Sequence, residues 1–312
     1  MKTILFLMVF SGIITVISSL NQQIEGTALR SIGYISESGK TSYRLISAFG
    51  FFSNDYGAYL QIILSILINL YFYVQRKRRK YILLLILPTL YTLFFTFSRS
   101  ATMGILVMII FLALVRKDHG KTIFISSLTV ILVSFLILNP VFKRWKTDSY
   151  VKKGGKLVLI KNISERLAQW EAGVDEFIKH PLIGRGFHTY HFREVDFESH
   201  FGILKYIGHA HNVYLRLSIE SGVFGLASFI ALIYLVYKYG FQLLKYRTNK
   251  DFELIVYIAL SSFSAFLVVA MTESILTVGR VTGPIFTLIG LLVVMSRIEI
   301  SQNEKLIHMK TI

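Results

Sequence analysis

The chain has 312 residues, of which 54% are hydrophobic and only 17% are charged, and its mean hydropathy is +0.57. Soluble domains carry about 25% charged residues, so this composition excludes a disordered or ordinary soluble chain and indicates a membrane protein. The lack of cysteine excludes disulfides, thiol catalysis and cysteine-ligated metals. A net charge of +16 fits nucleic acid, anionic lipid headgroups or an anionic substrate, so the location of the charges has to decide.

Eight apolar stretches approach the ~20 residues that a membrane-spanning helix needs. They lie at residues 3–20, 55–74, 81–97, 101–115, 122–138, 212–237, 252–271 and 281–296. Lys2 before the first stretch also fits a signal peptide, but a secreted protein would not need the seven stretches that follow. We therefore predict an all-α, polytopic membrane helix bundle of about eight spanning helices, with one large outer loop that carries an amphipathic helix.

Basic residues in short loops predict the orientation of such a bundle. They gather between stretches two and three, four and five, and six and seven, at residues 75–80, 116–121 and 238–250. We expect these loops and both termini in the cytoplasm, so the basic runs mark topology and no nucleic-acid partner is predicted. The chain then divides into helices one to five with an outer segment at 21–54, an outer loop, and helices six to eight with a cytoplasmic tail, at 1–138, 139–211 and 212–312.

The outer loop is the candidate working surface because it holds six of the eight histidines. Within it, six apolar residues recur at helical spacing: Ile163, Leu167, Trp170, Val174, Phe177 and Ile178. Asn162 and Glu165 resemble a capping box at the start of this pattern, and Pro181 ends it. The pattern predicts an amphipathic helix of about 17 residues that lies at the outer membrane face or packs across the bundle.

Three polar groups interrupt the apolar pattern. Arg99 sits in the short turn between stretches three and four, as a snorkelling residue or as a cation that binds phosphate. Arg216 and Glu220 lie one helical turn apart in the outer half of stretch six, so they should pair or face a water-filled cavity.

The sequence His209-Ala210-His211-Asn212 opens stretch six. Histidines two residues apart point to different sides of a helix, so they chelate metal poorly, and no metal site is predicted. A helix N-terminus disfavours the imidazolium form, which would keep His211 available as a proton acceptor. The alternative is an interfacial histidine beside a plain asparagine cap.

Two further patterns are weaker. Gly184-Arg185-Gly186 predicts a tight turn with exposed backbone N–H groups, without the third glycine of a dinucleotide site. Alternating acids at Glu194, Asp196 and Glu198 are interpreted as a solvated acidic stretch rather than as metal ligands.

Taken together, these motifs resemble the O-antigen ligase and O-antigen polymerase-like family of membrane glycosyltransferases. The resemblance covers roughly residues 44–237, and its pieces occur in the family's order. They are Arg44 with Gly50-Phe51 and Asn54, Ser98-Arg99, Arg166-x-x-x-Trp170, His180-Pro181-Leu182-x-Gly184-x-Gly186, His211-Asn212-x-Tyr214-Leu215 and Glu220-x-Gly222-x-x-Gly225.

The resemblance implies a cell-membrane enzyme that takes glycan from undecaprenyl pyrophosphate without metal or cofactor. Polymerases extend a lipid-linked chain, whereas ligases transfer glycan to lipid A core; we expect a polymerase, with a transporter of the same lipid-linked glycan or an inactive remnant as alternatives. The expected partners are the lipid-linked oligosaccharide, membrane lipids and a chain-length regulator.

Roles are assigned on this hypothesis as follows. His211 is the expected general base, with His209 as its substitute. Arg99 and Arg166 are expected to offset the negative charge of the pyrophosphate. Arg44, His209, Arg216, Arg280 and Trp170 are expected to bind substrate, the tryptophan by stacking on a sugar. Asn212 and Glu220 are expected to orient His211 and Arg216.

Overall fold

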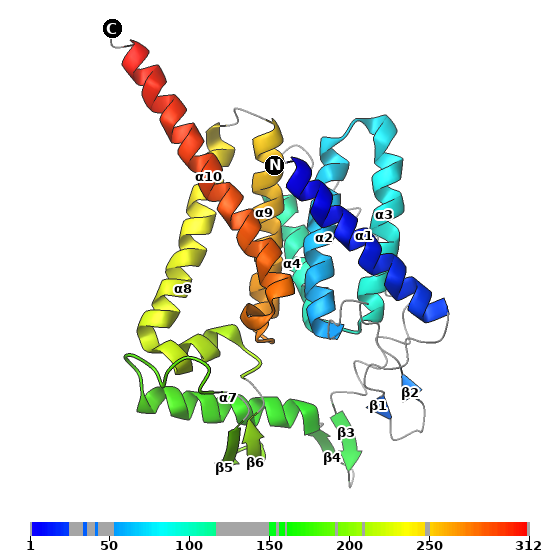
Figure 1. Cartoon of the computed structure of the whole chain (residues 1–312). Helices are drawn as coiled ribbons and strands as arrows, with labels where there is room; N and C mark the ends of the chain where they lie inside the picture. The colour runs from blue at the N-terminus through cyan, green and yellow to red at the C-terminus, as the bar shows by residue number, and fades with distance from the viewer. Residues whose placement is uncertain are drawn as a thin grey trace. The chain divides into compact units, whose positions relative to one another are not determined.

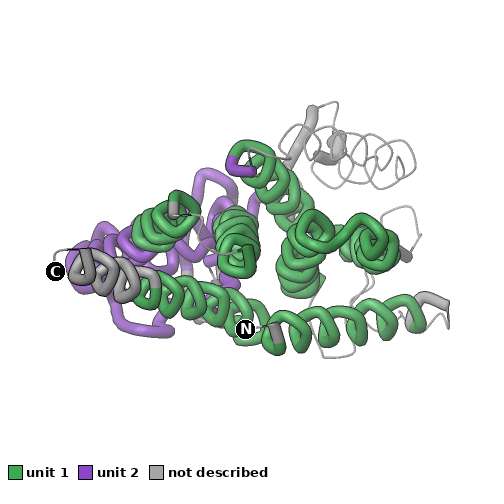
Figure 2. The backbone as a smooth tube through the Cα atoms, turned by 90° about the horizontal axis from the view of Figure 1, so that it is seen from above, with its two compact units in different colours: residues 1–114, 233–269, 277–312 green, residues 115–232, 270–276 purple. Residues whose placement is uncertain are grey.

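The computed structural model describes residues 2–24, 34–35, 41–42, 53–116, 150–153, 156–159, 161–190, 193–207, 210–246 and 250–310. The chain forms two compact units, each drawn in its own colour in Figure 2. Unit 1 comprises residues 1–114, 233–269 and 277–312, and unit 2 comprises residues 115–232 and 270–276.

Unit 1 is built from helices (Figure 1). They are α1 (Lys2–Ile24), α2 (Ser53–Tyr73), the 3-10 turn η2 (Arg76–Arg78), α3 (Arg79–Phe95), α4 (Arg99–Val115), the later part of α8 (Val213–Tyr246), α9 (Lys250–Ala270) and α10 (Gly279–Lys310). Seven of the eight predicted stretches are thus helices, and the stretch at 122–138 lies outside the described residues. By length and composition α1, α2, α8, α9 and α10 are each able to cross a membrane, and α4 is a shorter apolar helix. The predicted class, an all-α membrane bundle, is confirmed.

The most enclosed helices of the bundle are α2 and α9, whose most apolar windows are 72% and 78% buried. Buried polar side chains join them: Ser65 Oγ lies 2.6 Å from Ser261 Oγ, and Asn69 Nδ2 donates to Ser261 Oγ at 3.3 Å. In an apolar surrounding an unpaired hydroxyl or amide is costly, so these bonds fix which faces of the two helices meet.

Small residues let α4 approach the same pair of helices closely. Gln61 on α2 donates to the Ala101 carbonyl, and a Cβ on Gly104 would meet both Gln61 and the Ala265 carbonyl of α9. Close backbone approach through glycine and alanine is a common way in which membrane helices gain contact.

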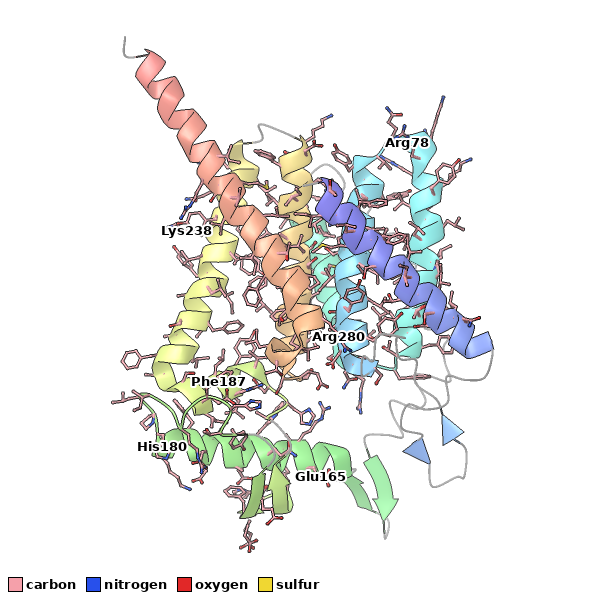
Figure 3. The ribbon with its side chains drawn as sticks, viewed as in Figure 1. Arg78, Glu165, His180, Phe187, Lys238 and Arg280 are labelled. Atoms are coloured by element: carbon pink, nitrogen blue, oxygen red, sulfur yellow. The ribbon has the colours of Figure 1, made fainter. Side chains whose placement is uncertain are left out.

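The ends of the helices in unit 1 follow an alternating pattern. Figure 3 labels Arg78 at the end of the bundle where α2 meets α3, and Arg280 at the opposite end, where α10 begins. The first residues of α1 and the last residues of α10 lie at the Arg78 end in Figure 1. This arrangement is the one that the loop charges predict, and the cytoplasmic location of that end stays a prediction.

Unit 2 contains the predicted amphipathic helix, α7 (Lys161–Lys179), which ends just before Pro181 as expected. Its small residues Ala168 and Ala172 pack with Tyr190, Ala210 and Ile219 in a buried cluster. The hydroxyl of Tyr190 donates to the Gln169 carbonyl of α7 at 2.7 Å. The helix therefore buries a face of alanines against the start of α8 and the residues that flank it.

Strands accompany the helices, which the sequence interpretation missed. The antiparallel hairpins are β1–β2 (Tyr34–Ile35, Thr41–Ser42), β3–β4 (Tyr150–Lys153, Lys156–Leu159) and β5–β6 (Arg193–Ser199, Gly202–Ile207). The acids Glu194, Asp196 and Glu198 are exposed on alternate positions of β5, while Phe197 packs on the core of unit 2. Alternation of acidic and apolar residues is the signal of a half-buried strand.

The turn of the β5–β6 hairpin is attached to α7 through Glu171. Ser199 Oγ donates to Glu171 Oε2 at 2.7 Å, and the backbone N–H of His200 donates to the same oxygen at 3.1 Å. The hydrogen bond from Ser199, followed by that from His200, lowers the pKa of the Glu171 carboxyl.

Helix α8 is broken at Gly222, where φ is +66° and ψ is −163°. The segment after the break has about 24 residues, or ~36 Å of helix, which exceeds the ~30 Å of a hydrocarbon core. Arg216 and Glu220 lie in the helical segment before this break, and both fall within the candidate span Val213–Lys245, at the start of stretch six as expected.

The loop after α7 fills that break. The N–H groups of Arg185 and Gly186 donate to the carbonyls of Ile219 and Glu220 at 2.8 and 3.0 Å, and Val223 donates to the Pro181 carbonyl at 2.8 Å. Since a break in a helix leaves backbone groups without partners, the loop replaces the lost helical bonds. The expectation of exposed N–H groups at the Gly184–Gly186 turn is wrong for this reason.

Candidate functional site

The candidate site lies in unit 2, where one carboxylate joins two of the predicted catalytic residues. Glu273 Oε1 accepts from Arg166 Nη2 at 3.1 Å, and Glu273 Oε2 lies 3.3 Å from His211 Nδ1. Arg166 Nη1 also donates to the Thr272 carbonyl at 3.0 Å. The side chains of Arg166, His211 and Glu273 are 35%, 18% and 10% exposed. They form a partly enclosed group that we call the His–Glu–Arg cluster.

The electrostatics of the cluster keep Glu273 ionised. Burial raises the pKa of the Glu273 carboxyl, but the hydrogen bond with His211 and the charge of Arg166 together outweigh burial, so that the pKa is lowered overall. A buried anion with two cationic or donor neighbours is a stable arrangement, and its loss would leave the arginine without its charge partner.

The arrangement defines a tautomer for the histidine. If Glu273 accepts the proton on Nδ1, then Nε2 is the nitrogen that accepts a proton from a substrate. The bonds to Glu273 and Thr272 use two of the five N–H donors of Arg166, which leaves capacity for an anionic ligand at its exposed part.

The backbone at His211 is unusual. Its φ is +48°, in the left-handed region that non-glycine residues rarely occupy, and the next residue, Asn212, caps α8 by accepting from the Leu215 N–H at 3.0 Å. Trp170 on α7 donates to the Ala210 carbonyl at 2.9 Å. The residues on both sides of His211 are thus fixed, Ala210 by the hydrogen bond from Trp170 and Asn212 by its role as helix cap. Backbone strain such as the positive φ of His211 is concentrated at functional sites.

A second polar group lies on the short segment of α8. Arg216 Nε donates to Glu220 Oε1 at 3.0 Å, with side chains 5% and 2% exposed. Arg216 Nη2 lies 3.2 Å from His188 Nδ1, and Nη1 is buried with no hydrogen-bond partner among the described residues. Both His188, with φ at +64°, and His211 therefore combine backbone strain with a charged neighbour.

The other predicted residues fall elsewhere. Arg99 is the exposed first residue of α4, preceded by Ser98, whose hydroxyl accepts from the Ala101 N–H at 3.3 Å. Arg280 begins α10 (Figure 3) and lines a largely apolar cavity of about 560 Å³ between α1, α2 and α10. Both arginines belong to unit 1. Arg44 and His209 lie outside the described residues.

Glu273 is the site residue that sequence analysis missed. It is the only acid between the last two apolar stretches, in residues 272–280, and a lone carboxylate in a short outer segment is the signal that could have identified it. Among the described residues, no three or more His, Asp or Glu side chains gather as a metal site would require.

The apolar helices indicate a multi-pass membrane protein, and the His–Glu–Arg cluster brings a histidine and an arginine to one carboxylate. Residues 84–230 match the family model described as O-antigen ligase, over slightly less than half of the chain. This match confirms the resemblance to an O-antigen ligase-like family that the motifs indicate. The matched segment includes Arg99, Arg166 and His211, whereas Glu273 follows it.

No curated protein matches the chain. The family match indicates a function of O-antigen ligase type in the assembly of cell-surface glycans. It accordingly indicates a membrane enzyme resembling glycosyltransferases, with lipid-linked polysaccharide as the class of substrate.

Proposed function

We propose that this protein polymerises a cell-surface polysaccharide by moving glycan from a polyprenyl pyrophosphate to a sugar hydroxyl on a second lipid-linked chain. The observation that carries the proposal is the His–Glu–Arg cluster, in which Glu273 is bonded to both His211 and Arg166. The proposal draws on the family match for the class of substrate.

In this reaction the acceptor hydroxyl attacks the anomeric carbon of the donor glycan. A carbon–oxygen bond forms to the acceptor, the bond from that carbon to the pyrophosphate oxygen breaks, and the electron pair leaves with the polyprenyl pyrophosphate. His211 Nε2 takes the hydroxyl proton while Glu273 stabilises the resulting imidazolium through Nδ1. Because the leaving group carries the developing negative charge, positioned cations supply the main stabilisation.

Arg166 of the cluster is the proposed cation on the pyrophosphate, and Arg99, Arg44 and Arg280 stay candidates from the sequence. Arginine suits this role since its planar fork donates two hydrogen bonds and stays protonated. Glu273 then has a second function, because its bond to Arg166 sets the direction of the guanidinium relative to the histidine. Trp170, half-buried against Ala210, is the proposed surface on which a sugar ring stacks.

The test is reconstitution of the purified full chain in liposomes with polyprenyl-pyrophosphate-linked repeat units. Polymerase activity predicts a ladder of lengthened glycan together with release of free polyprenyl pyrophosphate. Glycan transfer that occurs only after lipid A core is added would identify a ligase instead. Movement of the lipid-linked glycan across the bilayer without any lengthening would identify a transporter and would overturn the proposal.

A further inference from the structure

Unit 2 exposes large apolar side chains around the loop that fills the break in α8. Leu182, Ile183 and Phe187 are 62%, 80% and 82% exposed, and Phe224, just after the break, is 64% exposed. Figure 3 labels Phe187 in this loop. Clusters of exposed large apolar residues are rare on surfaces that face only water, so they mark a contact with another apolar phase or partner. We call residues 182–187 with Phe224 the apolar tip.

The apolar tip is held rigidly. Val223 donates to the Pro181 carbonyl, and Arg185 and Gly186 donate to the carbonyls just before the break, so the loop is bonded to α8 on both sides of Gly222. A Cβ at Gly222 would overlap the Leu182 carbonyl, so loop and helix are in direct backbone contact. The exposed side chains are therefore presented by a fixed backbone.

The charged residues beside the tip are paired. Between Pro181 and Phe187 the sequence has one charged residue, Arg185, and its guanidinium pairs with Glu176 on α7 at 2.8 Å. Lys179, at the end of α7, pairs with Asp175 at 2.7 Å. The loop thus combines exposed apolar side chains with paired charges next to them, which is the pattern of a segment at a membrane interface.

The link between the apolar tip and α8 indicates that the apolar phase is lipid. Helix α8 is long and apolar enough to span a membrane, and only 28% of its most apolar window is buried within the protein. Phe224 is both part of that segment and part of the tip. Exposed apolar residues are therefore found both on α8 and on the loop that is bonded to it.

We propose that the apolar tip inserts among the acyl chains of the leaflet in which α8 begins its crossing, as an interfacial anchor of unit 2. The anchor sets the depth of the Gly222 break and therefore of the buried Arg216–Glu220 pair before it. The proposal requires the chain to be a membrane protein and is independent of the transfer reaction.

The natural absence of cysteine permits a direct test, because each single-cysteine variant carries one spin label. Ile183→Cys and Phe187→Cys report on the tip. Leu84→Cys, 69% exposed on α3, is the lipid-facing control, and Glu198→Cys, exposed on β5, is the aqueous control. The labelled full chain is placed in lipid nanodiscs, and collision of each label with oxygen, which partitions into lipid, is compared with collision with a water-soluble nickel chelate.

Insertion predicts an oxygen-to-nickel collision ratio at positions 183 and 187 several-fold above that at position 198 and approaching that at position 84. A ratio equal to that of position 198 would place the tip in water and overturn the proposal. Protection from both reagents would also overturn it, because it would show the tip covered by protein, such as a second copy of the chain. Retention of the wild-type melting temperature by each variant confirms that the labelled chain is folded.

Discussion

His211 Nδ1 and Glu273 Oε2 lie 3.3 Å apart although the two residues are separated by 62 positions in the chain. The other oxygen of the same carboxylate accepts from Arg166 on α7. One side chain therefore ties together α7, the residue before the cap of α8 and the segment that follows α9. The side-chain orientations of His211, the proposed base, and of Arg166, a proposed cation, therefore both depend on Glu273.

Replacement of Glu273 by glutamine removes the negative charge and retains an acceptor oxygen. We expect kcat for glycan transfer to fall by about 10-fold or more, toward the full ~10²–10⁴ that a general base supplies, with little change in KM. Glu273→Asp keeps the charge and should restore part of the rate. Equal losses for the aspartate and glutamine variants, or a loss confined to KM, would show that the carboxylate does not act through His211.

The lowered pKa of Glu273 predicts how stability depends on pH. A carboxyl whose pKa is lower in the folded state stabilises the fold above its ordinary value of 4.5, and this contribution is lost as the pH falls through the folded pKa. The melting temperature of the wild type in detergent should therefore exceed that of Glu273→Gln near neutral pH. The difference should diminish as the pH drops from about 5 to about 3, and a difference that grows on acidification would contradict the assignment.

The break in α8 predicts a contrast between two glycines. At Gly222 a Cβ would overlap the Leu182 carbonyl and the positive φ disfavours any side chain, so Gly222→Ala should destabilise the fold by of order 1–3 kcal/mol. Gly290, within α10, has none of the described residues within 4 Å of an added Cβ, so Gly290→Ala should be neutral or stabilising. Thermal unfolding of both variants checks this, and similar losses would contradict the described break.

The buried pair on α8 distinguishes structure from binding. Arg216→Met leaves Glu220 buried without its partner and should cost about 3–5 kcal/mol, whereas the double variant with Glu220→Leu should recover most of that stability. Activity of the recovered double variant is the informative measurement. A stable, inactive protein supports substrate binding by Arg216, and a stable, fully active protein assigns the pair to structure alone.

Much of the fold was predictable because its signals are local. The length of the apolar stretches was enough to locate seven of the eight predicted helices. The helical spacing of apolar residues such as Ile163, Leu167 and Trp170 located α7. The break at Gly222 could not be predicted, because the apolar character of the sequence continues through it. The hydrogen bonds that replace the helical ones come from the loop after α7. The hairpin at Arg193–Ile207 could have been predicted, since its acids alternate with Val195 and Phe197.

The site was predictable only in part. Arg166 and His211 attract notice as polar residues in motifs, but their shared partner Glu273 comes from a different segment that only folding brings near them. Asn212 was expected to orient the histidine, and the structure shows it capping α8. A helix cap follows from neighbouring residues, whereas a contact across 62 positions requires the tertiary structure.

The most direct test of the central claim compares His211→Ala with His200→Ala in the reconstituted transfer assay at equal protein levels. His200 is a suitable control because its side chain is 88% exposed on the β5–β6 turn and pairs with Glu171, a carboxylate outside the cluster. We predict that His211→Ala lowers the rate of glycan lengthening and of polyprenyl pyrophosphate release together, by ~10²–10⁴, while His200→Ala retains the wild-type rate. Wild-type lengthening by a folded His211→Ala protein would contradict the account.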